Sequence, residues 1–455
     1  MNQLITKYNV PVPRYTSYPP ANFFRDAYDE NDLIKAIERS NQQEPAHLSF
    51  YIHIPYCNRM CHYCGCNAYP RQKESDVKRY VEALIREIEM VCDKIDKERR
   101  IAQIHYGGGS PTSIDPSFIR QINEILFSRF RTIDNPEIAI ECHAGYMGAH
   151  DFQMLSNAGF NRMSIGIQDF NPEVLKASNR LPTRLPIEEI FALLREKEEI
   201  RINLDFIYGL PLQSVKSFSA SIEKAIALAP DRLVTFSYAH MPQLFPRQKL
   251  LERKGLPSQE DKNNLYHAAR ELLLDGGYRQ IGLDHFIREE DELYGAFLTK
   301  TLHRNFQGYC TRRTTGQVYA FGVTAISQLA AAYAQNTKSI ETYIEAVNSG
   351  HIPVMRGYSL NEEEQITREV ITDLMCNEQI DWQQLASRLG RSPGEIKAAT
   401  AYAETTMKAL EEDGIIHYDD LQLVMREKGS PFIRNVAASL DKLLIHTDKT
   451  FSKPL

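Results

Sequence analysis

The chain has 455 residues, of which 43% are hydrophobic and 25% are charged, and its formal net charge is −6. These values are typical of a globular protein with a sizeable core, and the negative charge gives no electrostatic reason to expect nucleic acid or an anionic membrane as a partner. No segment approaches the roughly 18 consecutive apolar residues that a membrane-spanning helix needs.

The first 46 residues are expected to form an arm and a helix ahead of the main domain. The opening segment, MNQLITKYNVPVPRYTSYPP, has no basic region followed by an apolar run and does not resemble a secretory signal. A cytoplasmic location is therefore predicted. Because thiols stay reduced in the cytoplasm, closely spaced cysteines there are expected to bind a metal or to carry out redox chemistry.

A strand predicted at 48–55 leads directly into a loop that holds four of the eight cysteines. Cys57, Cys61 and Cys64 follow the pattern C-x3-C-x2-C, and no second C-x2–4-C pair of the kind found in zinc sites follows. Cys66 is too close to Cys64 for both to reach separate irons of one cluster. The spacing predicts a [4Fe–4S] cluster with three cysteine ligands and one open iron. A zinc loop or a chance grouping is the alternative.

Six segments are apolar and rich in β-branched or aromatic residues, which is typical of buried parallel strands. Helical patterns lie between them, the clearest at 75–95. This alternation predicts an α/β fold with a partial (β/α)6 barrel over residues 47–343. The strands are expected at 48–55, 102–108, 137–142, 162–168, 202–209 and 232–239.

Polar or glycine-rich residues occur where these strands end. Residues 107–111 (GGGSP) end the second strand, Glu141 the third and Gln168 the fourth. Asp205 lies within the fifth strand, and Ala239 ends the sixth. Each alone is explained equally well as a polar group at the edge of a core. Their common edge favours a ligand site, because active sites of such barrels lie at the carboxyl ends of the strands.

Beyond the barrel, a further antiparallel strand is expected at 278–286. The stretch 302–327 is rich in aromatic residues and glycine without periodicity, so it is expected to be a loop region that folds over the site. Residues 344–455 are predicted to be mostly helical, with a hairpin that turns at Asp419–Asp420, which resembles a winged-helix module. Its helices mix Glu with Lys and Arg, so a covering or docking role is favoured over DNA binding.

These stretches together resemble the radical S-adenosylmethionine (SAM) superfamily and, within it, the oxygen-independent coproporphyrinogen III oxidase (coproporphyrinogen dehydrogenase) family. The superfamily resemblance rests on C-x3-C-x2-C with Tyr63 before the last cysteine. The family resemblance covers nearly all of the chain, and Cys66 and RYTSYP (14–19) separate it from the related heme chaperone. Other matching stretches are HYGGGSPT (105–112), GFNRMSIGIQDFNPEVLKASNR (159–180), NLDFIYGLP (203–211), GLDHF (282–286) and LHRNFQGYCT (302–311).

The resemblance implies oxidative decarboxylation of two propionate side chains of coproporphyrinogen III to vinyl groups, which gives protoporphyrinogen IX in anaerobic heme biosynthesis. It also implies a [4Fe–4S] cluster, two SAM molecules and a flavodoxin- or ferredoxin-type electron donor. Nothing in the sequence demands more than a monomer. The cluster ligands would be Cys57, Cys61 and Cys64.

By motif position, the resemblance assigns further residues to the cofactors. The residues expected around the cluster-bound SAM are Tyr51, Gly108, Glu141 and Ile326. Those expected around a second SAM are Tyr63, Gly109, Ser110, Gln168, Arg180, Asp205 and Ala239. Tyr51 and Cys66 are the predicted catalytic residues. Cations should meet the substrate propionates, and the predicted cations are Arg14, Arg312 and Arg313.

Three other functions remain open from the sequence. The first is a radical SAM enzyme that opens or methylates heme, which would differ in its product. The second is a heme chaperone without turnover, which would bind heme tightly and release no CO₂. The third is a zinc-binding winged-helix regulator, which would contain zinc and no iron.

Overall fold

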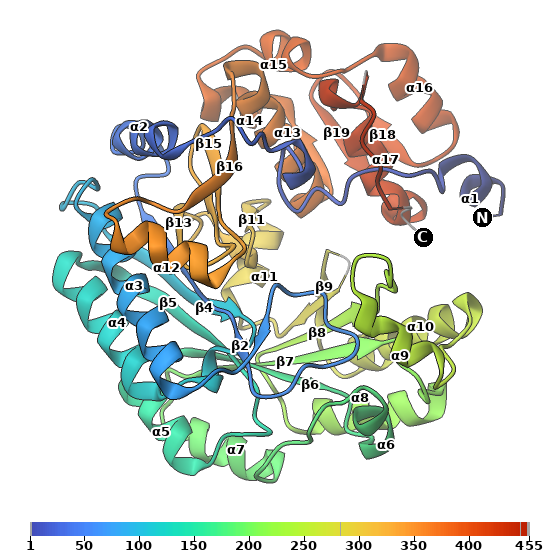
Figure 1. Cartoon of the computed structure of the whole chain (residues 1–455). Helices are drawn as coiled ribbons and strands as arrows, with labels where there is room; N and C mark the ends of the chain where they lie inside the picture. The colour runs from blue at the N-terminus through green and yellow to red at the C-terminus, as the bar shows by residue number, and fades with distance from the viewer. Residues whose placement is uncertain (1, 283, 446, 453–455) are drawn as a thin grey trace.

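A mixed sheet of twelve strands organises the structure, a computed structural model that describes residues 2–282, 284–445 and 447–452 (Figure 1). Six neighbouring strands in the sheet run parallel to one another. They confirm the six predicted strands and the α/β barrel. They are β1 (Leu48–Ile54), β4 (Ile101–Gly108), β5 (Thr132–Cys142), β6 (Arg162–Gln168), β7 (Arg201–Tyr208) and β8 (Arg232–Ser237).

Alternation along β1 explains how one strand serves both the core and the site, since successive side chains of a strand point to opposite faces. Phe50 and Ile52 belong to the main hydrophobic core, together with apolar residues of α3 (Glu74–Cys92). Tyr51 and His53 lie on the other face, inside the barrel. The further helices on the outside, visible around the sheet in Figure 1, are α4 (Pro116–Arg129), α5 (Ala149–Asn157), α6 (Pro172–Ala177), α7 (Ile187–Arg195), α8 (Val215–Ala227) and α10 (Gln259–Asp275).

Two stretches differ from the prediction. The single strand expected at 278–286 is instead a pair of short antiparallel strands, β9 (Arg279–Ile281) and β10 (His285–Ile287), and β10 also pairs with β8. The loop region expected at 302–327 contains a hairpin of β11 (Leu302–Asn305) and β12 (Gly308–Thr311). It also contains β13 (Gln317–Phe321), which is buried throughout and pairs in parallel with β1. The loop prediction is wrong for this segment, because five residues are too few to show a periodicity.

The sheet then continues past the barrel through β14 (Ile326–Gln328), β15 (Ala332–Asn336) and β16 (Val354–Ser359). The boundary expected between residues 343 and 344 falls inside α12 (Ile340–Asn348). Beyond β16 lies a second core around Trp382. The elements of this part are α13 (Glu362–Asn377), β17 (Gln379–Asp381), α14 (Trp382–Leu389), α15 (Pro393–Ala399), α16 (Glu404–Glu412), β18 (Ile416–Tyr418), β19 (Gln422–Met425) and α17 (Ile433–Ala438). The predicted hairpin is confirmed as β18 and β19.

The N-terminal arm packs on this last part of the chain (Figure 1). After α1 (Asn2–Tyr8) it runs extended, and Nε of Arg434 donates a 3.0 Å hydrogen bond to the carbonyl oxygen of Pro13. The hydroxyl of Tyr15 donates to Asp441 at 2.9 Å. The arm then continues into α2 (Glu30–Ser40), beside the sheet.

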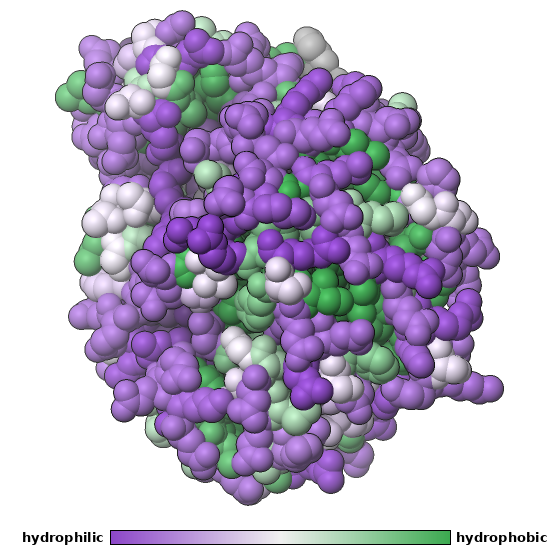
Figure 2. Space-filling view, turned by 90° about the vertical axis from the view of Figure 1, so that its left-hand side faces the viewer, coloured by the Kyte–Doolittle hydropathy of each residue, from purple (hydrophilic) through white to green (hydrophobic). Residues whose placement is uncertain are grey.

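Within the described residues, no helix has the length and apolar character needed to cross a bilayer. The face shown in Figure 2 is mostly hydrophilic, with hydrophobic residues at the surface in patches bordered by polar ones.

Candidate active site

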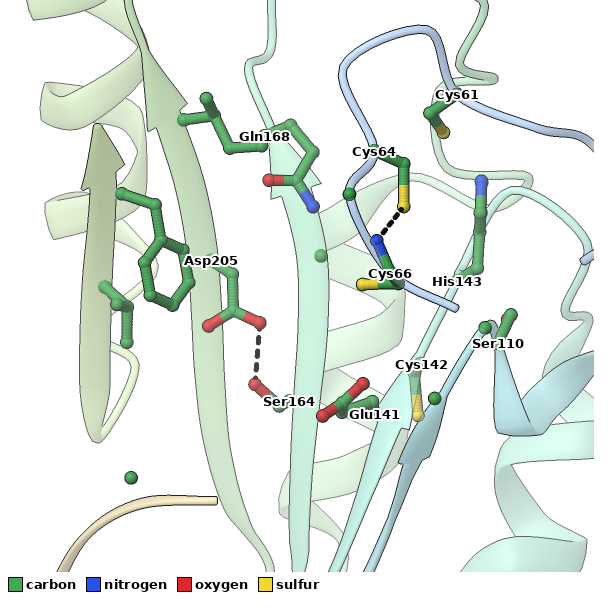
Figure 3. A pocket seen from close by; sticks show the side chains of 18 of the residues that line it. Cys61, Cys64, Cys66, Ser110, Glu141, Cys142, His143, Ser164, Gln168 and Asp205 are labelled. Carbon is green, nitrogen blue, oxygen red and sulfur yellow. Dashed lines mark hydrogen bonds between the residues drawn. The ribbon is translucent and has the colours of Figure 1, made fainter. Parts of the chain in front are cut away.

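A cavity of about 470 Å³ opens at the carboxyl ends of the parallel strands (Figure 3). Most of the residues that the sequence predicted for a site line it together. The predicted residues in its lining are Cys57, Cys61, Tyr63, Cys64, Cys66, Gly108, Gly109, Ser110, Glu141, Gln168, Arg180, Asp205 and Ala239. The structure therefore brings residues from the whole length of the barrel to one place.

The cysteine loop begins directly after β1 and is held at both ends by backbone hydrogen bonds. The amide of Tyr69 donates to the carbonyl oxygen of Pro55 at 2.7 Å, and the amide of Arg71 donates to that of Cys57 at 2.8 Å. Two contacts favour the thiolate forms that a metal cluster requires. The amide of Cys66 donates to Sγ of Cys64 at 3.4 Å, and Nη1 of Arg180 lies 3.6 Å from Sγ of Cys61.

These contacts fit an iron–sulfur cluster, since hydrogen bonds to the cysteine sulfurs are among the ways a protein tunes such a group. Hydrogen bonding from Cys66 lowers the pKa of the Cys64 thiol. Burial raises the pKa of Cys57 to about 12, so this thiol is protonated without a metal and must lose its proton when it binds iron. In the part of the chain that the structure describes, no three His, Cys, Asp or Glu side chains are placed to hold a single metal ion.

Glycines let the end of β4 approach the cysteine loop closely. A methyl group on Gly108, whose φ is +118°, would lie 2.7 Å from the carbonyl oxygen of Ile54. A methyl group on Gly109 would lie 2.9 Å from the carbonyl oxygen of Tyr56. Side chains are therefore excluded here, and the backbone forms the cavity wall.

Two carboxylates reach the cavity from neighbouring regions of the sheet, in different surroundings (Figure 3). The side chain of Glu141 is 47% exposed, and its Oε1 lies 3.2 Å from Nε2 of His105. Asp205 accepts a 2.8 Å hydrogen bond from the hydroxyl of Ser164. Burial raises the pKa of Asp205 to about 6. The cavity thus offers two separate acceptors for cationic or hydroxyl groups.

Arg180 and Gln168 form the wall beside the cysteines. Nη1 of Arg180 donates to the hydroxyl of Tyr63 at 3.1 Å, and its Nη2 donates to the carbonyl oxygen of Gly166. Gln168 has a φ of +68°, and its Oε1 is buried without a hydrogen-bond partner in the described structure. A buried acceptor without a partner costs free energy, so it indicates a site where a ligand donates a hydrogen bond.

Tyr51 lies just behind the cavity wall. A methyl group on Gly107 would lie 3.0 Å from its hydroxyl oxygen and 2.8 Å from Oε1 of Glu141, so the three residues are close neighbours. The hydroxyl of Tyr51 lies 3.2 Å from Nδ1 of His53. Burial raises the pKa of Tyr51 well above its ordinary value, so it remains a hydrogen-bond donor.

Four further predicted residues are not part of the cavity lining. Ile326 is on β14 and packs near the group around Tyr333. Arg312 does not reach the cavity, because its Nη2 pairs with Oδ1 of Asp373 at 2.9 Å. Arg313 does not reach it either, because its Nη2 pairs with Glu292 at 2.7 Å. Arg14 lies on the arm, exposed to solvent.

The lining also contains residues to which the sequence assigned no role. Ser164 and His105 position the two carboxylates, and His285 and Tyr309 close the side of the cavity formed by β10 and β12. His285 and Tyr309 belong to the stretches GLDHF and LHRNFQGYCT, which carried the family resemblance. Their positions in these two motifs could have marked them as candidate site residues.

The fold and site define a radical SAM protein: a barrel of parallel strands with a three-cysteine loop at its carboxyl face. The family model of the Radical SAM superfamily matches residues 51–225, and that of the HemN C-terminal domain matches residues 360–432.

Comparison with individual proteins narrows this class. The chain is 35% identical to the oxygen-independent coproporphyrinogen III oxidase of Synechocystis sp. over 448 residues, which cover 98% of this chain and 96% of the relative. It is 35% identical to the Escherichia coli protein of that name over 446 residues, which cover 97% and 95%. The solved structure of coproporphyrinogen III oxidase (HemN) from Escherichia coli, described as a radical SAM enzyme, superposes with a TM-score of 0.86 at 34% identity, covering 95% of this chain and 98% of that chain. The chain belongs to the oxygen-independent coproporphyrinogen III oxidase family, as the sequence motifs predicted.

Proposed function

We propose that this chain catalyses oxygen-independent oxidative decarboxylation of coproporphyrinogen III. Two propionate side chains become vinyl groups, and the product is protoporphyrinogen IX, an intermediate of heme biosynthesis. The observation that carries this proposal is the meeting of the cysteine loop, Glu141, Arg180 and Asp205 in one cavity. It occurs in a chain that matches enzymes named for this activity over nearly its whole length.

In this proposal Cys57, Cys61 and Cys64 hold a [4Fe–4S] cluster, and SAM binds at the open iron. When bound, the cluster and SAM would supply a 5′-deoxyadenosyl radical that takes one hydrogen atom from each reacting propionate, and loss of CO₂ with transfer of one further electron to an external acceptor would give the vinyl group. In this proposal Glu141 accepts hydrogen bonds from the ammonium group of SAM. Gly108 has no side chain, so the cofactor can approach the backbone there. The protein positions the groups and limits access of water.

We further propose that a second SAM binds in the part of the cavity that lies between the cysteine loop and β7. Gln168 offers an acceptor without a partner in the described structure, and Asp205 a partly buried carboxylate, and both suit hydroxyl or amino groups. The remaining residues of this proposed subsite are Tyr63, Gly109, Ser110, Arg180 and Ala239.

Cys66 and Tyr51 are the proposed catalytic residues. The backbone amide of Cys66 donates a hydrogen bond to the sulfur of Cys64, and the side chain of Cys66 lines the cavity (Figure 3). Cys66 is not a fourth cluster ligand in this proposal. Tyr51 is a protonated donor beside Glu141. The proposed electron donor is a flavodoxin- or ferredoxin-type carrier, and the proposed state is a cytoplasmic monomer.

The experiment is anaerobic. The full chain is reconstituted with iron and sulfide and mixed with a reductant, SAM and coproporphyrinogen III. The mass of the tetrapyrrole product is then measured by mass spectrometry. We expect loss of two CO₂ per macrocycle in the wild type and in Cys92→Ala, which alters a buried cysteine outside the cavity, and no loss in Cys61→Ala. A ring-opened or methylated product, or heme binding without CO₂ release, would replace the proposal with one of the alternatives.

A further inference from the structure

Four basic side chains from four separate segments lie at the edge of the cavity, and we call them the rim cluster. Three of them act on Asp284, the residue before β10, and the fourth contacts the end of the neighbouring strand β8. The strands β4 to β8 separate β10 from β1 in the sheet. Only one of the four, His285, is in the cavity lining itself. The rim cluster consists of Arg14, Lys262, His285 and Arg304.

His285 links the rim cluster to the cavity. Its Nδ1 lies 2.7 Å from Oδ1 of Asp284, and its side chain is 15% exposed. Its ring meets that of Tyr309 edge-on, with centroids 5.0 Å apart. The other ring nitrogen, Nε2, would lie 3.8 Å from a methyl group on Gly308, which also lines the cavity.

Arg304 has unused hydrogen-bonding capacity. It lies on β11 with its guanidinium carbon 5.0 Å from the centre of the Tyr309 ring. Its Nε is buried and has no hydrogen-bond partner within the described residues. A buried charged donor without a partner is costly, so the position suits an anion that is bound for part of the catalytic cycle.

Lys262 and Arg14 come from distant parts of the chain, α10 and the N-terminal arm. Nζ of Lys262, on α10, donates a 2.7 Å hydrogen bond to the carbonyl oxygen of Tyr238, at the end of β8. The arm is fixed on both sides of Arg14, through Pro13 and Tyr15. Burial lowers the pKa of Lys262, and the positive charge of Arg14 lowers it further, so the two cations are close enough to repel each other.

The acidic groups of the region do not balance these charges. Burial alone would raise the pKa of Asp284, but His285, Arg304 and Arg14 together hold it below its usual value, so this carboxylate is ionised. For Arg14, Lys262 and Arg304, no described carboxylate oxygen lies within 4.0 Å. The rim cluster therefore has more positive than negative charge, in a chain whose formal net charge is −6.

A purely structural role accounts for only part of this arrangement. The contact of Lys262 with Tyr238 holds α10 against the end of β8, but it needs no second cation nearby. Repulsion between Lys262 and Arg14 costs free energy, and a bound anion would remove that cost. Arginine and lysine beside a polar cavity are the usual partners of carboxylates.

We propose that the rim cluster binds the carboxylates of the propionate groups that are not reacting, and so orients the tetrapyrrole in the cavity. This inference rests on the proposed function. Coproporphyrinogen III has four propionates and its product keeps two, so a carboxylate site apart from the cysteine loop would hold groups that survive the reaction. The arm and the barrel would then both contact the substrate.

The test measures binding of porphyrins, the air-stable oxidised forms of the macrocycle, to the reconstituted full chain by fluorescence. Coproporphyrin III carries four propionates, and mesoporphyrin IX carries only the two that the product retains. We expect Arg304→Gln and Lys262→Gln each to weaken binding of both porphyrins by about tenfold to 100-fold, the loss of one charge-assisted contact. Mesoporphyrin dimethyl ester should bind the variants and the wild type equally.

Matched controls are Arg426→Gln and Lys224→Gln, two exposed cations outside the cavity, which should leave all three affinities unchanged. Arg304→Lys keeps the charge and should restore part of the affinity, which separates charge from packing. Unchanged binding of both porphyrins in Arg304→Gln and Lys262→Gln would overturn the proposal. Weakened binding of coproporphyrin alone would overturn it too, since the cluster would then hold the reacting propionates.

Failure of the proposed function is visible separately. If coproporphyrinogen III loses no CO₂ but the porphyrin affinities respond as expected, the rim cluster is a carboxylate site in a protein with another reaction. If the chain is active, the variants should raise KM for coproporphyrinogen III more than they lower kcat. Formation of 5′-deoxyadenosine without substrate should be unaffected.

Discussion

Nη1 of Arg180 lies 3.6 Å from Sγ of Cys61 and so places a buried positive charge beside a proposed cluster ligand. A cation next to an iron–sulfur cluster favours the reduced, more negative state. Arg180→Gln is therefore expected to lower the reduction potential of the cluster and to slow SAM cleavage by about tenfold or more. Arg184→Gln, on an exposed side chain four residues later, is the control. A redox titration followed by electron paramagnetic resonance checks the shift, and an unchanged potential in Arg180→Gln would contradict it.

Gly108→Ala is predicted to impair SAM binding without unfolding the chain. The new methyl group would lie 2.7 Å from the carbonyl oxygen of Ile54 at a φ of +118°, so the strand end must move away from the cysteine loop. We expect SAM affinity to fall by about tenfold or more, with a cost in stability of about 1–3 kcal/mol. Gly394→Ala is the control, because no atom lies within 4 Å of its methyl position. Equilibrium dialysis with labelled SAM gives the affinities, and equal values for both variants would refute the prediction.

The sequence predicted those elements whose pattern is local in the chain, and it missed those that depend on distant partners. Strands such as β1 were predictable, because long apolar runs alternate with amphipathic helices. The strand β13 was missed because its five residues are ordered by pairing with β1, which lies more than 250 residues away in the chain. Pairing of this kind leaves no local pattern.

The same reasoning applies to the site. The position of Glu141 and Asp205 in the cavity lining was predictable, because parallel strands bring their carboxyl ends together, a rule that needs no side-chain detail. Arg312 was misplaced, because its partner Asp373 comes from α13, 61 residues later in the chain. The positions of Lys262 and Arg304 likewise depend on how α10 and β11 pack. The presence of an arginine or lysine in a loop does not by itself show which carboxylate pairs with it in the folded chain.

Glu87 is predicted to be the main polar anchor between α3 and the strands β13 to β15. Its carboxylate accepts hydrogen bonds from the amide of Gly322 at 2.8 Å, from Nδ2 of Asn336 at 2.6 Å and from the hydroxyl of Tyr343 at 2.5 Å. Glu87→Ala would leave the amide of Gly322 and the hydroxyl of Tyr343 without partners, and Asn336 with only its 2.9 Å bond to the carbonyl oxygen of Gly322. We therefore expect a loss of about 2–3 kcal/mol or more in the free energy of unfolding. Glu82→Ala, at an exposed position of the same helix, should cost less than about 0.5 kcal/mol. Urea denaturation measures both, and similar midpoints would show that Glu87 is not an anchor.

Asp205 should make both stability and ligand binding depend on pH. Burial raises its pKa to about 6 in the folded chain, from an ordinary value of 3.8. Below about pH 4 the carboxyl is neutral in the folded and unfolded chains and costs nothing. As the pH rises through 6 the folded chain must hold a buried charge, and its stability falls. Asp205→Asn removes that cost, so its stability relative to the wild type should be higher at pH 8 than at pH 4, by about 1–3 kcal/mol.

The same carboxylate is proposed to accept hydrogen bonds from a second SAM, and this gives the opposite pH dependence for binding. A protonated Asp205 is a weaker acceptor, so occupancy of the second SAM should fall as the pH drops below about 6 in the wild type. In Asp205→Asn it should be weak at every pH, because the charge is absent throughout. Counting bound SAM at pH 5.5 and pH 7.5 distinguishes the cases. Ser164→Ala, which removes the 2.8 Å hydrogen bond that stabilises the carboxylate, should move the wild-type transition to higher pH. A transition that stays in place in Ser164→Ala would mean that another group controls binding.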